Sequence, residues 1–453
     1  MSRSRTEGRP TAPATETSSS SPGRRGIPIG SFEVRRLAIL SLHTSPLTQP
    51  GTGDGGGMNV YVRELSTALA RAGAECDVYT RADGEDLPAT VQVEPGFRVH
   101  HVPAGPLEPV PKERLVDYVG EFGDGVMSLM TAGGTATGRS SEFDAVHANY
   151  WLSGLAGHRI KHELDLPLVS TFHTLARVKA EASPEEISTD EPHRRAEAEA
   201  EIVSCSDAVL VSCYVEAEQL VALYGADPAR VEIVPPGVDH AFFAPGDRTQ
   251  ARRALGFAPG EPLVLFVGRI QPLKGADVAI RAVGLLRSSD GLADVNLAVV
   301  GGPSGPCGRT HDEEIGRLVA FLGLQDRVRR LPAQSHELLS TFYRAADVCV
   351  MPSRSESFGL VALEAAACGI PVVASAVGGL TTLVQDGVSG VLVEERAPEA
   401  YARAIAKLLA EPLLGAEMGA AGADLSRGYT WAGAARKLLG VYDGLVEVRL
   451  VSC

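Results

Sequence analysis

The chain has 453 residues and a formal net charge of −14 at pH 7. This length exceeds what one hydrophobic core usually serves, so we expect two or three domains. Hydrophobic residues make up 44% and charged residues 22%, which is ordinary globular composition and excludes a fibrous or wholly disordered protein. The negative charge disfavours a nucleic-acid or membrane binder, because such proteins recruit phosphates with a cationic surface.

Seven cysteines are scattered along the chain, and none forms a C-x-x-C pair. An odd, dispersed set predicts reduced thiols and favours neither a disulfide framework nor a zinc site. Apolar runs stay well short of the roughly 18 residues of a membrane span. The first residues also lack the apolar stretch of a signal peptide. We therefore expect a cytoplasmic protein with no nucleic-acid partner and no stable membrane association.

Residues 1–33 are rich in Ser, Thr, Pro, Gly and Arg, which predicts a disordered tail. From residue 34 onward, short apolar runs alternate with amphipathic stretches, the pattern of strands and helices around a parallel sheet. A first domain is predicted over residues 34–240, with a helix near residues 58–72. Its predicted strands are 36–43, 74–81, 97–104, 144–150, 166–173 and 208–213.

A second series of strands and helices predicts a domain over residues 241–429, after a hinge near Pro235 and Pro236. Its predicted strands are 263–270, 296–302, 327–333, 347–353 and 371–377. Residues 430–453 are predicted to form a helix that packs back on the first domain. The fold class is thus α/β, with two Rossmann-like domains. Ligands should bind between them, where the carboxyl ends of the strands meet.

The most specific motif is SRSESFGLVALEAAACGIPVVAS, in which Glu356 and Glu364 are separated by seven residues. The pattern predicts Glu356 in a loop and Glu364 inside the following helix, roughly 12 Å further along its axis. Carboxylates accept hydrogen bonds from sugar hydroxyls, and the first helical turn can hold a diphosphate. A solvated helical pair is the alternative, which the flanking apolar and small residues disfavour.

This E-x7-E motif resembles the retaining glycosyltransferases of the GT4 group, which have the GT-B fold. The resemblance extends from about Arg35 onward. It implies that Glu364 binds the ribose of a nucleotide and that Glu356 contacts the transferred sugar.

FVGRIQPLKG places Arg269 and Lys274 after a predicted strand, where two cations can neutralise a diphosphate and the charge that grows on it. Surface cations at the end of a strand are the alternative for either residue alone. The family resemblance assigns both to the donor diphosphate. With His173 and Glu356, they make up the catalytic group that we expect.

The loop HTSPLTQPGTGDGGGMNVYV lies between the first strand and a helix, where backbone amides can approach an anion. A flexible linker would look similar. The loop resembles the subfamily of inositol phosphate N-acetylglucosaminyltransferases of mycothiol biosynthesis, although Gly55 stands where Ser or Ala is expected. This resemblance implies UDP-N-acetylglucosamine as donor and inositol phosphate as acceptor.

The same resemblance implies the remaining binding residues. The acceptor residues are His43, Asp54, Gly55, Gly56, Gly57, Met58, Asn59, Lys112, Tyr150, Thr174 and Arg194. The donor residues are Gln49, Pro50, Gly57, Arg269, Lys274, Gln334, Glu356 and Glu364. Lys112 and Arg194 could instead be surface charges, and Tyr150 could be a core residue. Because Arg195 follows Arg194 directly, the sequence leaves open which of the two arginines is the binding residue.

Retention of configuration normally needs a nucleophilic carboxylate, and the motifs supply no obvious candidate. The GT4 resemblance implies front-face substitution, with His173 in a positioning role; a satisfied core histidine is the alternative. The sequence has no D-x-D motif, so we expect catalysis without a metal. The resemblance does imply a structural magnesium ion. Its expected ligands are Tyr343, Arg344, Ala346 and Ile370.

Other readings remain at this stage. Another GT4 enzyme, such as a phosphatidylinositol mannosyltransferase, would need a membrane-docking surface, yet residues 113–130 are acidic. A nucleotide-sugar epimerase of the same fold would need an acid/base carboxylate pair that the sequence does not offer. A non-catalytic sugar-nucleotide sensor is disfavoured by the intact Glu and Lys/Arg motifs. We expect a homodimer.

Overall fold

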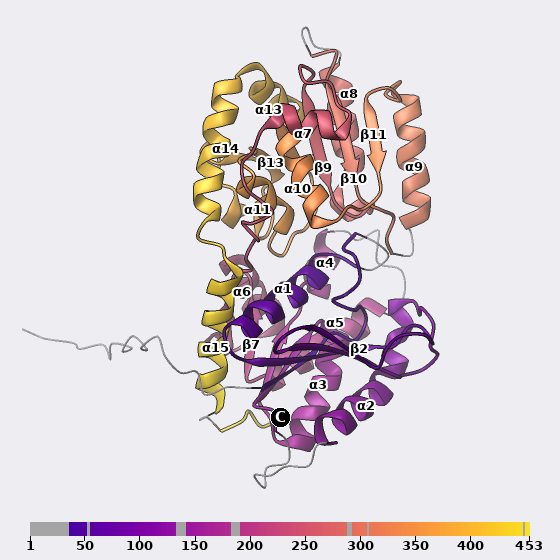
Figure 1. Ribbon diagram of the computed structural model, residues 1–453, viewed down its shortest axis with the longest axis vertical. Coiled ribbons are helices and arrows are strands. Elements are labelled where there is room, and N and C mark those ends of the chain that lie inside the picture. The colour runs from indigo at the N-terminus through magenta and orange to yellow at the C-terminus, as the bar shows by residue number, and fades with distance from the viewer. Residues whose placement is uncertain are drawn as a thin grey trace, which may run out of the picture.

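The computed structural model describes residues 36–51, 55–132, 142–182, 191–287, 292–305, 308–446 and 449–453. Figure 1 shows two α/β domains, one above the other, each with a sheet at its centre and helices packed around it. The predicted architecture of two parallel-sheet domains is therefore confirmed. The predicted tail and Asp54 lie outside the described residues.

The sheet of the first domain has the strand order β3-β4-β2-β1-β5-β6-β7-β8. Neighbouring strands are parallel, except that β3 and β4 are antiparallel. Its elements are β1 (Arg36–Leu40), α1 (Gly57–Arg71), β2 (Glu75–Arg81), β3 (Thr90–Glu94), β4 (Phe97–Val102), a 3-10 helix (Lys112–Tyr118), α2 (Val119–Thr131), β5 (Ala145–Asn149), α3 (Trp151–Leu164), β6 (Leu168–Thr171), α4 (Ala176–Ala182), α5 (Glu191–Cys205), β7 (Ala208–Val211), α6 (Tyr214–Tyr224), a 3-10 turn (Pro228–Arg230) and β8 (Val231–Ile233).

The sheet of the second domain has the order β11-β10-β9-β12-β13-β14, with parallel neighbours. Its elements, with the final helix, are α7 (Arg248–Leu255), β9 (Leu263–Val267), a 3-10 turn (Pro272–Lys274), α8 (Ala276–Leu286), β10 (Asn296–Val300), α9 (Gly308–Phe321), β11 (Val328–Leu331), α10 (His336–Ala345), β12 (Val348–Met351), α11 (Leu360–Ala367), β13 (Val372–Ser375), α12 (Leu380–Leu383), β14 (Gly390–Val393), α13 (Pro398–Ala410), α14 (Pro412–Ser426) and α15 (Trp431–Val446).

Helices cover both faces of each sheet, which is why the central strands read as continuous apolar runs. In β1, Leu37 and Ile39 belong to the core beneath α1 and α15, whereas Ala38 and Leu40 belong to the core beneath α2 and α3. Alternate side chains of a strand point to opposite faces, so a strand covered on both sides is mostly apolar, and a buried polar side chain within it, such as His147 of β5, has partners of its own. The polar residues that matter for chemistry are thereby displaced to the strand ends.

Helix α15 packs against α1 of the first domain, beside which it lies in Figure 1. The chain passes between the domains at two segments that cross each other. There the Val238 amide donates to the Tyr429 carbonyl at 3.1 Å, and a Cβ at Gly237 would lie 2.1 Å from the Trp431 amide nitrogen. The predicted hinge near Pro235 therefore lies directly beside a second connection, so both segments must adjust if the domains move.

The expectation that the cysteines form no disulfide is wrong at one place. Cys205, at the end of α5, and Cys453 are joined as a disulfide, although 248 residues separate them in the sequence. Cys76, Cys213, Cys349 and Cys368 are free thiols and all are buried, whereas Cys307 lies outside the described residues. Sequence spacing could not reveal the pair, because α3, α5 and residues 449–453 meet only in the folded chain.

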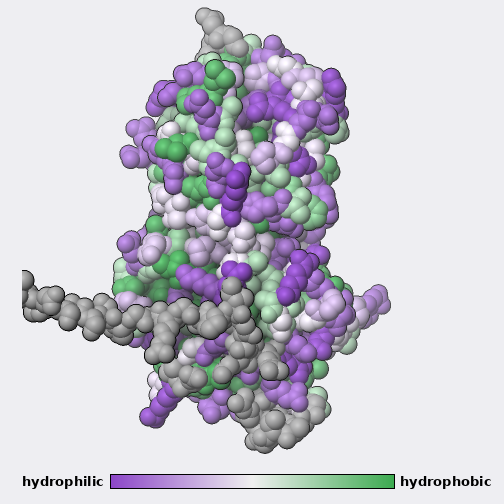
Figure 2. Space-filling view, turned by 60° about the vertical axis from the view of Figure 1, so that its left-hand side comes forward, coloured by the Kyte–Doolittle hydropathy of each residue, from purple (hydrophilic) through white to green (hydrophobic). Residues whose placement is uncertain are grey.

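None of the helices among the described residues combines the length and the apolar character needed to cross a membrane. On the face shown in Figure 2, hydrophobic and hydrophilic residues are interspersed over both domains.

The contact between α15 and the first domain gives a stability prediction. The buried Tyr442 hydroxyl is 2.8 Å from Nδ1 of His147, whose Nε2 is 2.8 Å from the Thr171 hydroxyl. Burial lowers the pKa of His147 to about 3, so its ring is neutral at pH 7. Tyr442→Phe leaves one ring nitrogen buried without its partner. We expect it to lower the free energy of unfolding by about 1–3 kcal/mol, measured by urea denaturation.

Lys437→Ala, on the exposed face of the same helix, is the control and should change the unfolding free energy by less than about 0.5 kcal/mol. Equal unfolding midpoints for Tyr442→Phe and the unmodified protein would show that the hydrogen bond contributes nothing.

Candidate active site

The site lies where loops at the carboxyl ends of the two sheets touch. Ser357, just before α11, donates its hydroxyl to the His173 carbonyl at 2.6 Å. On the other side of the seam, the Gln49 amide donates to the Ala333 carbonyl at 3.3 Å. The edge of one domain therefore faces the edge of the other, and residues from both can reach one ligand.

The two glutamates lie as predicted, Glu356 in the loop before α11 and Glu364 inside that helix. Gly359 caps the helix with a φ of 101°, a conformation that favours glycine. A Cβ at this position would also lie 2.8 Å from Cδ2 of Leu380. The close turn is what brings the loop carboxylate and the helix N-terminus to the same edge of the sheet.

Glu364 is buried and accepts a hydrogen bond of 2.7 Å from the Tyr343 hydroxyl. Burial raises the pKa of Glu364 to about 7, and the Tyr343 hydrogen bond offsets part of that rise. Tyr343 is the last aromatic residue of α10, and no sequence pattern links it to Glu364. A carboxylate held in this way is oriented before a ligand arrives and titrates near neutral pH.

Both predicted cations lie at the carboxyl end of β9. Lys274 ends the 3-10 turn, and its Nζ is 2.6 Å from Oε2 of Glu356. Arg269 lies two residues after the strand, and its Nη1 donates to the Ser304 hydroxyl at 3.3 Å. The ion pair is partly solvated, with side chains 22% and 17% exposed, so we assign it an orienting effect rather than a large stabilisation.

On the first domain, His43 is at the centre of a basic cluster. Its ring packs 4.4 Å from the Tyr150 ring, between centroids. Burial lowers the pKa of His43 to about 3, and the nearby positive charges of Lys112, Arg195 and Arg269 lower it further. Nδ1 of His43 is buried and finds no hydrogen-bond partner among the described residues. A neutral imidazole ringed by cations is suited to an anionic ligand that carries hydroxyls.

Arg195, rather than Arg194, reaches this cluster. Its guanidinium donates to the Tyr150 hydroxyl at 3.0 Å, to the Thr174 carbonyl at 2.6 Å and to Glu199 at 2.7 Å. Arg194 is exposed on the other side of α5, because successive helical residues are rotated by about 100°. Arg195 therefore replaces Arg194 as the candidate binding residue. The sequence had left both positions open.

Backbone strain marks two further predicted residues. Tyr150 and His173 follow β5 and β6 and have φ values of 74° and 61°. Nε2 of His173 is 2.9 Å from the amide oxygen of Asn149, and burial lowers the pKa of His173 to about 3. Non-glycine residues at positive φ are uncommon and often lie at functional sites. His173 is therefore an oriented, neutral group and not a charged one at pH 7.

The glycine-rich loop is organised by Asn59. Its carboxamide accepts from the Gly56 amide at 2.8 Å and donates to Oγ1 of Thr44 and the carbonyl of Ser45 at 2.7 and 2.6 Å. These bonds use both donor hydrogens, so the Asn59 side chain shapes the loop. A Cβ at Gly56 would lie 3.4 Å from Nε of Arg269, which shows how closely the loop approaches the second domain.

The other predicted residues lie along the same seam. Lys112 begins the 3-10 helix, and Gly57 and Met58 begin α1. The side chain of Gln334, before α10, donates to the Pro332 carbonyl at 2.7 Å. Pro50 precedes Gly51, where a Cβ would lie 2.7 Å from the Cβ of Ala333, and the Gly51 amide donates to the Gly55 carbonyl at 2.9 Å. Thr174 is exposed.

The residues expected around a structural magnesium ion offer no side-chain oxygen for it. The Tyr343 hydroxyl is engaged by Glu364, and the Arg344 guanidinium is itself a cation that donates to the Phe242 carbonyl at 3.1 Å. Ala346 and Ile370 have apolar, buried side chains. Since none of these side chains is a carboxylate, magnesium could bind at these positions only through main-chain carbonyl oxygens and water.

Family models match both domains. "Glycosyl transferase 4-like domain" matches residues 56–237, and "Glycosyl transferases group 1" matches residues 247–424. The D-inositol 3-phosphate glycosyltransferase of Actinosynnema mirum is 46% identical over 417 residues, covering 92% of this chain and 98% of the relative. That of Geodermatophilus obscurus is 47% identical over 416 residues, covering 91% and 90%.

Solved structures share the fold. Sucrose-phosphate synthase from Thermosynechococcus elongatus gives a TM-score of 0.81 at 32% identity and covers 91% of this chain and 99% of that chain. Anabaena Alr3699/HepE, solved in complex with UDP-glucose, gives 0.69 at 20% identity and covers 90% and 98%.

The raised pKa of Glu364 gives a pH prediction. Below pH 7 the carboxyl is largely protonated, and above it the carboxylate can accept hydrogen bonds from both hydroxyls of a ribose. We therefore expect the affinity for UDP to increase about tenfold between pH 6 and pH 8, measured by calorimetry.

Glu364→Gln is the matched variant, because it retains the shape and removes the titration. It should bind UDP more weakly and, once the titration of UDP itself is subtracted, show no pH dependence. A slope that persists in Glu364→Gln would assign the effect to another group.

Proposed function

This chain belongs to the glycosyltransferase family that includes the D-inositol 3-phosphate glycosyltransferases, and we propose that it transfers N-acetylglucosamine from UDP-N-acetylglucosamine to 1D-myo-inositol 3-phosphate. The reaction retains the anomeric configuration and releases UDP. It is the first step of mycothiol biosynthesis in this proposal. The transferase activity follows from the family, whereas the donor sugar and the acceptor are what we propose.

The basic cluster around His43 is the observation that carries the choice of a phosphorylated acceptor. Lys112 and Arg195 bring positive charge to one small region of a protein whose net charge is −14. A phosphate there would gain charge-assisted hydrogen bonds. The unpaired Nδ1 of His43 and the Tyr150 hydroxyl supply polar groups for the ring hydroxyls of an inositol.

The second domain supplies the donor side of the proposal. Glu364 accepts from the ribose, Glu356 contacts the sugar, and Arg269 and Lys274 stabilise the diphosphate as negative charge develops on it. The amides of the first turn of α11 add partial positive charge at the same place.

Transfer proceeds by front-face substitution in this proposal. The acceptor oxygen forms a bond to the anomeric carbon on the side from which UDP departs, and the bond from that carbon to the β-phosphate oxygen breaks. The hydroxyl proton of the acceptor passes to the departing phosphate oxygen. His173 orients the sugar as a neutral group, and contact between the domains excludes water. A trapped covalent glycosyl-enzyme would contradict this sequence of events.

UDP release from UDP-N-acetylglucosamine, by EDTA-treated protein with and without inositol 3-phosphate, tests the proposal. We expect release only with the acceptor, because its hydroxyl displaces UDP from the anomeric carbon. The release should persist in EDTA, because the chain's own cations neutralise the leaving group. Two comparison reactions test the alternative functions. One offers GDP-mannose with phosphatidylinositol vesicles, as a mannosyltransferase would need. The other offers the donor alone and uses NMR to detect an epimer. Turnover in either of these, without turnover on inositol 3-phosphate, would overturn the acceptor assignment.

Arg195 and Arg194 provide a matched pair of variants. Arg195→Ala removes a cation from the basic cluster and should raise the KM for inositol 3-phosphate at least tenfold, while UDP affinity stays within twofold. Arg194→Ala should leave both unchanged, because that side chain is exposed to solvent. The UDP measurement also detects any general loss of folding. Equal KM values in the two variants would refute the assignment of Arg195.

A homodimer, a cytoplasmic location and a structural magnesium ion stay predictions from the sequence.

A further inference from the structure

Four metal-ligating side chains meet at the end of the first domain that faces away from the site. They are His158 and His162 of α3, Cys205 at the end of α5, and Cys453. The ligand atoms all lie within 4.8 Å of one another. In the part of the chain that the structure describes, this is the one such group of three or more histidine, cysteine or acidic residues.

Three nitrogen–sulfur distances in this group are close to those of a tetrahedral site. Nε2 of His162 lies 3.3 Å from the Cys453 sulfur and 3.5 Å from the Cys205 sulfur. Nε2 of His158 lies 3.6 Å from the Cys453 sulfur. With zinc–sulfur bonds of about 2.3 Å and zinc–nitrogen bonds of about 2.05 Å, a regular tetrahedron has a nitrogen–sulfur edge of about 3.6 Å.

We propose that these four residues, with Cys205 and Cys453 reduced, form a structural Zn²⁺ site with two thiolate and two imidazole ligands. Each thiol releases one proton when the ion binds, and no electrons are transferred. Opening the disulfide beforehand takes two electrons and two protons from a cellular thiol reductant, which is itself oxidised to a disulfide, and leaves both sulfurs beside the same two imidazoles. In a reducing compartment the thiols persist and the metal form is favoured.

The surroundings of the ligands resemble those of a metal site. Nδ1 of His158 lies 3.3 Å from Oε1 of Glu201, so a carboxylate orients the ring with Nε2 toward the sulfurs. Metal-bound histidines commonly donate their second ring N–H to such a group. The two histidines are four residues apart on one helical face, a spacing that lets both bind one ion.

Other contacts fix the two cysteines independently of a bond between them. The buried Lys161 ammonium donates to the Cys205 carbonyl at 2.7 Å and to Asp207 at 2.8 Å. The other oxygen of Asp207 accepts from the Val451 amide at 2.7 Å. One buried ion pair thus positions both the end of α5 and the segment that carries Cys453.

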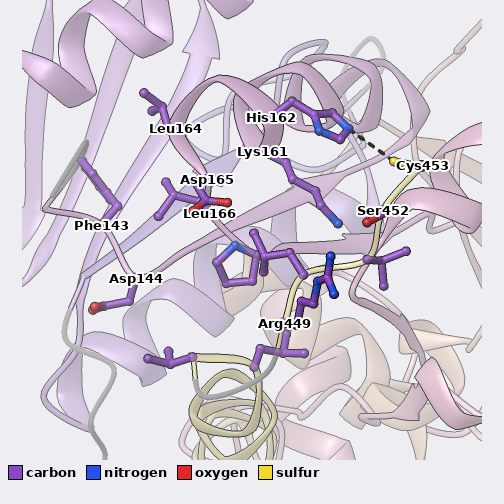
Figure 3. A pocket seen from close by; sticks show the side chains of 15 residues that line it. Phe143, Asp144, Lys161, His162, Leu164, Asp165, Leu166, Arg449, Ser452 and Cys453 are labelled. Atoms are coloured by element: carbon purple, nitrogen blue, oxygen red, sulfur yellow. Dashed lines mark hydrogen bonds between the residues drawn. The ribbon is translucent and has the colours of Figure 1, made fainter.

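Figure 3 shows where this segment lies. Residues 449–453 line a cavity of about 900 Å³, with His162 beside Cys453 and Lys161 beneath. Asp144 and Pro167, which precede β5 and β6, also line it. These are the amino ends of the strands, whereas the active site is at their carboxyl ends. The ion would therefore fasten residues 449–453 to the first domain and take no part in sugar transfer.

Cobalt(II) titration of reduced, metal-free protein tests the site. We expect one Co²⁺ per chain, visible tetrahedral d–d bands, a near-ultraviolet thiolate charge-transfer band, and displacement by Zn²⁺. His162→Ala and Cys453→Ser should each weaken binding at least tenfold and alter the charge-transfer band. Glu201→Gln should weaken it about tenfold. His193→Ala, an exposed histidine of α5, is the control and should bind as the unmodified protein does.

Zn²⁺ should also raise the thermal midpoint of the unmodified protein but not of Cys453→Ser. UDP release should stay within twofold in every variant, so the test is independent of the proposed function. Failure of the reduced protein to bind Co²⁺, unchanged spectra in His162→Ala and Cys453→Ser, or a disulfide that resists reduction would each overturn the proposal.

Discussion

Parallel strands bring all the strand-to-helix connections of a domain to one edge of its sheet. In this protein two such edges touch, through Ser357 and His173 on one side and Gln49 and Ala333 on the other. The interior of each sheet is covered on both faces and is mostly apolar, and its buried polar side chains, such as Asp77 and His147, are bound to neighbours within the fold. Chemistry is therefore confined to the seam, whichever substrates bind there.

Burial gives the seam its electrostatic character. The protein is acidic overall, yet Arg195 and Lys112 concentrate positive charge around His43, which stays neutral. Arg195 tolerates burial because Glu199 pairs with it and the Thr174 carbonyl accepts from it. The same Glu199 also accepts from the Tyr224 hydroxyl. A cation fixed in this way keeps its position before a ligand arrives, which reduces the reorganisation needed on binding.

The end of the chain completes the first domain. Helix α15 buries Tyr442 against His147, and β5, which holds His147, also holds Asn149, the partner of His173. Further along, Val451 is held by Asp207, and Cys453 lies beside Cys205. Residues more than 200 positions apart thus share one core. The stability of the first domain consequently depends on a segment that follows the second domain in sequence.

Much of the fold could be predicted from local pattern. The apolar runs correctly located the main strands of both sheets, because each is buried on two faces and reads as a continuous run. Three strands were missed. β3 is a partly exposed antiparallel edge strand, β8 has only three residues just before the predicted hinge, and β14 follows a turn-rich segment.

The E-x7-E motif, the two cations after β9 and the glycine-rich loop can be recognised in the sequence, because each depends on neighbours a few residues apart. Folding was needed to show that Arg195 and not Arg194 enters the cluster, since the rotation of α5 about its axis is set by packing. It also decided that Tyr343 supports Glu364 and that His158, His162, Cys205 and Cys453 meet. Such long-range contacts leave no periodic trace in the sequence, because they depend on how helices far apart in the chain pack together.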